Sequence, residues 1–166
     1  MKYKTDREVI METYNYYGKD PVGRRSVYIN EHEEIKCAYN SDKGHCAVGR
    51  CLKAEYRNQG LYLISNTDSI SDFEKNQVKN INDMVKPSYS MILDDLWVAL
   101  QDFHDNSDNW WFGEGAPEYA GFGDDEQPEQ SGQFKYLTTI GEKVLGKMLK
   151  TAEYNEKNNV DRRSYS

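Results

Sequence analysis

The chain has 166 residues, of which 21 are Lys or Arg and 28 are Asp or Glu, so its formal net charge is -7. The charge is unevenly distributed, because the segment 87–134 contains eleven acidic residues and no Lys or Arg. The rest of the chain has 21 basic and 17 acidic residues and is mildly basic. This distribution argues against a general nucleic-acid binder, which needs a cationic face to displace counterions from phosphate. The eleven acids are Asp94, Asp95, Asp102, Asp105, Asp108, Glu114, Glu118, Asp124, Asp125, Glu126 and Glu129.

Length and aromatic content predict one folded domain. A chain of 166 residues fits a single domain, and 13% of its residues are aromatic although the mean hydropathy is only -0.92. No apolar run is long enough to span a membrane, and the first residues lack the apolar stretch of a signal peptide. We therefore expect a cytoplasmic protein with one domain over 1–155 and a polar tail over 156–166.

The first half of the chain predicts one helix and several short strands. Thr5 and Glu8 have capping-box spacing at the start of a helix over 5–17, and Gly18 can end it. Short strands are expected at 26–29, 34–39 and 45–48. The turn at 41–44 carries Asp and Gly, which favour a hairpin over 34–48.

The second half is dominated by helical patterns. Capping-box spacing predicts a helix from Ser71 to the residues before Pro87. The clearest apolar stripe covers 89–105, where Ser88 can act as the cap. Segment 106–132 has no period and predicts an acidic, aromatic loop or insertion, a feature that is often functional. Thr139 and Glu142 have capping-box spacing and predict a last helix capped by Thr139, with a core stripe from Ile140 to position 152. These elements predict an α+β fold of about four helices packed with a small antiparallel sheet that contains the 34–48 hairpin.

Three cysteines and a histidine lie close together in the sequence. Cys37, His45, Cys46 and Cys51 include the residue types that bind zinc. Their spacing lacks a Cys-x2-Cys pair, and adjacent strand residues point to opposite faces. Buried thiols of the core are the better explanation, so we expect no metal and no cofactor.

A catalytic alternative combines one of these thiols with the end of the strong helix. Cys46 or Cys37 could act as nucleophile, His104 as base and Asp105 as the residue that orients the base. Such a site would make the protein a hydrolase or a transferase. The simpler explanation of His104 is a histidine near a helix C-terminus, where the dipole and nearby acids favour its charge.

The acidic segment also contains a group of aromatic residues that could form a binding surface. Rings interleaved with carboxylates suit a basic protein surface, since rings anchor a partner and carboxylates steer the encounter. They could also imitate nucleic acid toward a nucleic-acid-binding protein. The alternative is a solubilising loop whose Trp side chains fold back onto the core. The predicted binding residues are Trp110, Trp111, Phe112, Glu114, Tyr119, Phe122, Asp124, Asp125 and Glu126.

Two adjacent arginines, Arg24 and Arg25, give a further binding alternative. Guanidinium groups bind phosphate, so these residues could hold a small anionic ligand such as a signalling nucleotide. Ordinary surface charge is the better explanation of these two residues.

Two blocks of sequence resemble a set of uncharacterised small proteins of phages and bacteria. The shared pattern is Cys-x-Tyr, then Cys-Ala-(Val/Ile)-Gly, then Leu-Gln-x-x-His-Asp followed by Trp. The matching residues here are Cys37, Tyr39, Cys46, Ala47, Val48, Gly49, Leu100, Gln101, His104, Asp105 and Trp110. The resemblance implies a compact α+β domain and a phage origin, but no activity.

Charge, aromatics and resemblance together favour a non-enzymatic binding protein. We expect it to engage a host protein with a basic surface through segment 106–130. Such a protein would act as an inhibitor in host takeover or counter-defence.

Overall fold

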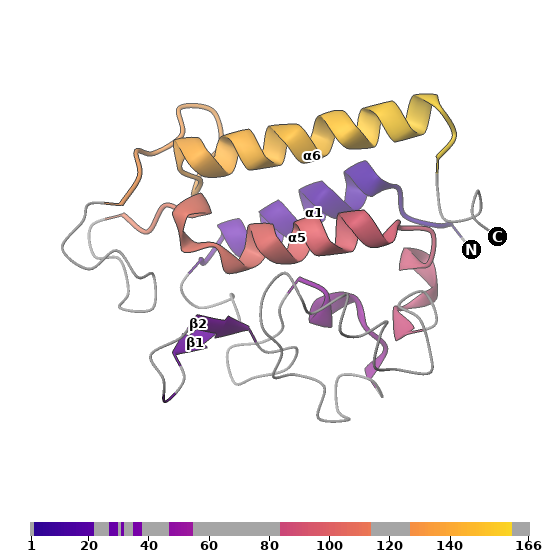
Figure 1. Cartoon of the computed structure of the whole chain (residues 1–166), viewed down its shortest axis with the longest axis horizontal. Helices are drawn as coiled ribbons and strands as arrows, with labels where there is room; N and C mark the ends of the chain where they lie inside the picture. Colours follow the sequence, from indigo (N-terminus) through magenta and orange to yellow (C-terminus); the bar gives the residue numbers. More distant parts are fainter. Residues whose placement is uncertain are drawn as a thin grey trace.

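Three α-helices dominate the part of the chain that the structure describes. The structure is a computed structural model, and it describes residues 2–21, 27–29, 31, 35–37, 47–54, 84–113 and 127–160. Figure 1 shows α5 and α6 side by side with α1 behind them, and α1 contacts both. The helices are α1 (Asp6–Gly18), α5 (Asp94–Asp105) and α6 (Thr139–Lys157). The short 3₁₀-helices are η1 (Gly49–Cys51), η2 (Pro87–Tyr89) and η3 (Ser107–Asn109).

The expected α+β fold is wrong, because the described residues are mostly helical. The strands β1 (Val27–Ile29) and β2 (Ile35–Cys37) have three residues each and pair antiparallel, with Val27 opposite Cys37. The predicted 34–48 hairpin is replaced by pairing of β2 with the strand that precedes it. Val48 lies in the turn before η1 and donates its backbone N–H to the side chain of Gln101, so it needs no strand partner. Residues 38–46 lie outside the described part.

The capping signals in the sequence predict the start of α1 correctly, but they misplace the caps of α5 and α6. Thr5 caps α1 as expected, and its hydroxyl accepts the N–H of Glu8 at 3.2 Å. The cap of α6 is Thr138 rather than Thr139, since its hydroxyl accepts the N–H of Gly141 at 3.1 Å. The strong helix starts later than the apolar stripe suggests, because Pro87 begins the separate turn η2 and Ser88 caps nothing. The helix expected before Pro87 falls mainly on residues 55–83, outside the described part.

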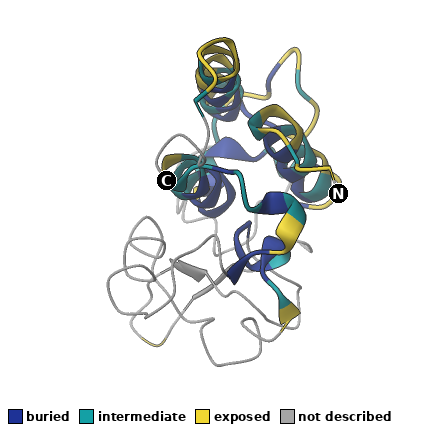
Figure 2. Cartoon of the chain, turned by 90° about the vertical axis from the view of Figure 1, so that its right-hand side faces the viewer, coloured by how far each residue is buried: buried dark blue, intermediate teal, exposed yellow. Residues whose placement is uncertain are grey.

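The core lies where the three helices meet the segments that follow η1 and η3. Figure 2 shows the buried residues along the inward faces of the helices. The rings of Tyr17, Trp97, Phe103 and Trp110 are fully buried. By contrast, Ile140 was expected in the core stripe of α6 but is 41% exposed.

Candidate binding groove between α5 and α6

A groove of about 960 Å³ lies between α5 and α6. On another side of α5, the ring of Tyr17 from α1 contacts the ring of His104, with centroids 4.6 Å apart. One face of α5 thus packs in the core, and another face lines the groove. A volume of this size is at the upper end of the roughly 300–1,000 Å³ of small-ligand pockets, so the groove can hold more than one side chain.

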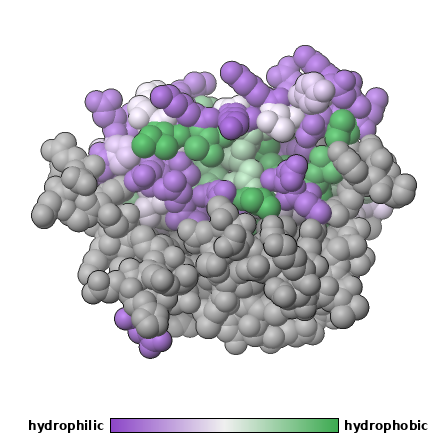
Figure 3. All heavy atoms as spheres, viewed as in Figure 1, coloured by the Kyte–Doolittle hydropathy of each residue, from purple (hydrophilic) through white to green (hydrophobic). Residues whose placement is uncertain are grey.

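Apolar side chains from both helices line the groove. α5 contributes Leu96 and Ala99, and α6 contributes residues with the same kind of spacing, among them Val144 and Met148. Intervals of three and four residues place side chains on one helical face. Figure 3 shows apolar atoms gathered in a strip between the two helices, with hydrophilic groups along its edges. The groove therefore offers an apolar floor to a ligand.

Carboxylates form the edge of this apolar floor. Asp95 and Asp102 lie seven residues apart on α5, which corresponds to about 10 Å along a helix. Asp108 on η3 and Asp6 at the start of α1 also border the groove. Lys147 is the one basic side chain among the described residues that line it. Negative charge therefore predominates among the described lining residues, and it favours a cationic ligand.

The acidic end of the groove holds an unfavourable pair of carboxyl groups. Burial raises the pKa of Asp102, and the nearby carboxylate of Asp105 raises it further. Asp105 itself is 4% exposed, and its Oδ1 lies 2.6 Å from Nδ1 of His104 and accepts a 3.0 Å hydrogen bond from Gln101. A cation bound near Asp102 would relieve the repulsion between the two carboxylates.

Two shielded oxygen atoms lie beside the same end. Ser107 is 5% exposed and Asn109 is 2% exposed, and both border the groove. Nδ2 of Asn109 donates to the carbonyl of Phe103 at 3.2 Å. Its Oδ1 and the Oγ of Ser107 have no hydrogen-bond partner among the described residues. Such unpaired polar atoms typically cost about 1–3 kcal/mol each, and a donor from a ligand could offset that cost.

The position of this end is fixed by contacts between η3 and α6. The backbone N–H of Thr138 donates to the carbonyl of Asn109 at 3.1 Å, and the hydroxyl of Thr138 donates to the carbonyl of Asp108. A β-carbon on Gly141 would collide with the backbone of Asn109, so glycine allows this close approach. These contacts hold the edge residues of η3 against the start of α6.

His104 and Asp105, the proposed base and orienting group, do meet, but in the core. His104 is fully buried, and Gln101 of the same cluster accepts the N–H of Val48 at 3.2 Å. The backbone N–H of Val48 from the first block of the phage-like pattern thus joins Gln101, His104 and Asp105 from the second in one buried polar cluster. This arrangement has a structural role, because it pairs buried backbone and side-chain groups.

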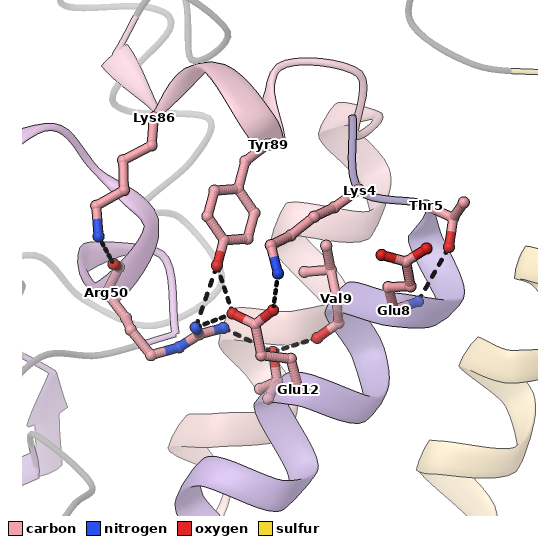
Figure 4. A network of polar contacts seen from close by, with 9 residues as sticks. Lys4, Thr5, Glu8, Val9, Glu12, Arg50, Lys86 and Tyr89 are labelled. Atoms are coloured by element: carbon pink, nitrogen blue, oxygen red, sulfur yellow. Dashed lines mark hydrogen bonds and ion pairs between the residues drawn. The ribbon is translucent and has the colours of Figure 1, made fainter. Parts of the chain in front are cut away.

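The third cysteine also lies in a structural setting. Figure 4 shows the carboxylate of Glu12 on α1 between Arg50 and Tyr89, with Lys4 on its other oxygen at 2.7 Å. Burial tends to raise the pKa of Glu12, but these hydrogen bonds outweigh it and hold the pKa at about 2. Next to this network, burial raises the pKa of the Cys51 thiol to about 11 against the opposing effect of Arg50. Cys51 is therefore a poor nucleophile near neutral pH.

The predicted aromatic binding residues divide into two groups. Trp110 is fully buried, and its ring nitrogen donates to the carbonyl of Phe103 at 3.0 Å. It therefore belongs to the core and presents no ring to a partner, which agrees with the alternative of a Trp folded back onto the core and not with the predicted binding role. Trp111 and Phe112 are half-buried and lie just after it.

The other predicted site residues fall outside the described part. They are Arg24, Arg25, Cys46, Glu114, Tyr119, Phe122, Asp124, Asp125 and Glu126, together with the side chain of Cys37.

Several groove residues were missed by the sequence-based site prediction. Asp95, Asp102 and Asp108 belong to the acidic segment, but the prediction did not distinguish them from its other acids. The seven-residue interval between Asp95 and Asp102 on one helix was the available signal. Ser107 and Asn109 have no comparable signal, because their importance depends on the contact between η3 and α6.

The described residues contain neither a metal site nor a membrane-spanning helix. Within the described ranges, no three His, Cys, Asp or Glu side chains are grouped to hold a metal ion. None of the helices described here is long and apolar enough to cross a membrane. No protein-family model, curated protein sequence or solved structure matches this chain.

Proposed function

We propose that this protein is a non-enzymatic binding protein that holds a basic segment of a partner protein in the groove between α5 and α6. The observation that carries the proposal is the convergence of Asp6, Asp95, Asp102 and Asp108 on one apolar groove that has Lys147 as its only basic side chain among the described lining residues. The resemblance to phage proteins makes a host protein the preferred partner, with host takeover or counter-defence as the consequence.

Affinity and selectivity for the partner come from different parts of the groove. The apolar floor supplies affinity, since removing apolar surface from water contributes roughly 25 cal/mol per Å² before the costs of association. The carboxylates on the edge select for positive charge and accelerate encounter. Each solvent-exposed charge pair adds only about 0.2–1 kcal/mol, so a basic partner without apolar residues would bind weakly.

A defined peptide pair tests this function. One fluorescent peptide is built of Lys and Leu, and the second replaces every Lys by Glu. We expect the basic peptide alone to bind in anisotropy titrations, and its affinity to fall as salt is raised. Equal binding of both peptides, or of neither, contradicts the proposal.

Matched charge variants locate the site. Replacing Asp95 and Asp108 by Asn removes two charges from the groove, and replacing Glu129 and Glu153 by Gln removes two from exposed positions outside it. The first pair should weaken binding of the basic peptide by about 2–30-fold, from two lost charge pairs. The second pair should leave it nearly unchanged. Equal losses would mean that the peptide responds to net charge rather than to the groove.

A further inference from the structure

The described helices leave an apolar face open on the groove side. α1 contacts both α5 and α6, and Figure 1 shows it behind them. Figure 3, in the same view, shows apolar atoms between α5 and α6 at the front of the molecule. Helices pack by inserting side-chain ridges into the grooves between ridges, and helical bundles commonly have four members. The groove thus has the character of a helix-binding surface.

The spacing of the groove residues matches a helical ligand. Ala99 lies three residues after Leu96, while Val144 and Met148 are four residues apart. Ridges of this kind on two neighbouring helices fit the ridges of a third helix. The small side chain of Ala99 allows the close approach that interaxial distances of about 8–10 Å require.

The charges define which helix would fit. Asp95 and Asp102 lie two turns apart on α5, and Asp108 follows beyond the end of that helix. A helix lying along α5 would meet them with basic residues at intervals of seven. The shielded oxygens of Ser107 and Asn109 lie at the same end and can accept hydrogen bonds.

We infer that the groove binds an amphipathic basic α-helix of the partner, whose apolar stripe packs on α5 and α6 and whose Lys or Arg residues face Asp95 and Asp102. This inference rests on the proposed function and specifies the form of the partner. It corresponds to the helix-in-groove mode of peptide recognition.

The test compares two peptides of identical composition with the full-length protein. In the first, Leu residues recur at intervals of three and four, and Lys residues flank this stripe at intervals of seven. In the second, the same residues are shuffled so that no stripe remains. We expect the first peptide to bind at least about tenfold more tightly than the second. We also expect its circular dichroism spectrum to become more helical on binding.

A steric variant tests the position of the helix. Ala99→Trp fills the groove and should weaken binding of the striped peptide by about tenfold or more. Lys150→Trp places the same side chain on the exposed surface of α6, outside the groove, and should have little effect. If Ala99→Trp fails to fold, Ala99→Met provides a smaller obstruction. Binding unaffected by a folded Ala99 variant would overturn the inference.

A helical partner and a basic partner of any form predict different results with the two peptides. If both peptides bind equally and Asp95→Asn weakens both, the basic partner stands and the helix is wrong. If neither peptide binds, both ideas fail. Light scattering adds one more outcome, because a dimer that Ala99→Trp converts to monomer would show that a second copy of this chain occupies the groove.

Discussion

Gly141 offers a direct test of how the groove end is built, because the backbone of η3 packs on α6 at this residue. A β-carbon placed on Gly141 would lie 2.9 Å from the carbonyl carbon and 3.0 Å from the Cα of Asn109, and closer still to the carbonyl oxygen. The colliding atoms belong to the backbone and cannot rotate away. Gly141→Ala must therefore move η3 relative to α6.

The expected magnitude follows from two opposing effects. Overpacking of this kind costs about 1–3 kcal/mol, and displacement of Asn109 also strains its hydrogen bond with Thr138, worth about 1 kcal/mol. Alanine gains about 0.5–1 kcal/mol over glycine inside a helix. We expect a net loss of about 1–3 kcal/mol in the free energy of unfolding. Gly146→Ala in the same helix has no atom within 4 Å of its new β-carbon and should gain about 0.5–1 kcal/mol.

Urea unfolding followed by tryptophan fluorescence measures both variants. Trp97 and Trp110 are fully buried and should report the transition. The same substitution in one helix should shift the midpoint in opposite directions. A Gly141→Ala protein as stable as Gly146→Ala would refute the proposed packing of η3 on α6.

Three further substitutions or probes test the surroundings of the groove and the core. Glu12→Gln should lower the free energy of unfolding by about 1–3 kcal/mol near neutral pH because Arg50 loses a charged partner. Since the carboxyl has a folded pKa of about 2 against an ordinary 4.5, this loss should shrink as pH falls through that window in acid-dependent urea melts. Cys51, with a pKa of about 11, should react with a thiol probe far more slowly in the native protein than in urea, as peptide mapping would show. Asp102→Asn should raise the melting temperature at neutral pH, because burial and Asp105 raise the folded pKa of Asp102, and the gain should vanish below its ordinary pKa of 3.8.

Local signals in the sequence predicted the helices better than the fold. The cap at Thr5 depends on a side chain three residues from its partner, so sequence spacing was sufficient. The start of α5 was misplaced because Ile92 and Leu93 continue the apolar stripe of the helix, although they lie in the turn between η2 and α5. The 34–48 hairpin failed for a different reason, since Val48 is paired with Gln101, 53 residues away. Such a partner leaves no local trace.

The candidate site was predictable only in part. The segment without Lys or Arg marked the acidic face, and three of its aspartates, Asp95, Asp102 and Asp108, border the groove. The second wall comes from α6, whose apolar residues looked like ordinary core. Trp110 illustrates the same limit, because both an exposed and a buried ring were compatible with its sequence context, and only its contacts with Phe103 and Tyr17 decide for burial.

The acidic residues of α5 lie at opposite ends of the helix. The unfavourable position of the one near the C-terminal end supports a role of that residue in binding. Asp94 and Asp95 lie in the first turn, where the helix dipole favours negative charge. Asp102 lies near the opposite end, where the dipole disfavours it, and both burial and Asp105 raise its pKa. Its charge therefore opposes folding on three counts, yet it borders the groove. A cation bound in the groove would reverse this balance, so Asp102→Asn should stabilise the free protein while weakening its binding of the basic peptide. If Asp102→Asn changed neither property, its charge would be irrelevant to both folding and binding.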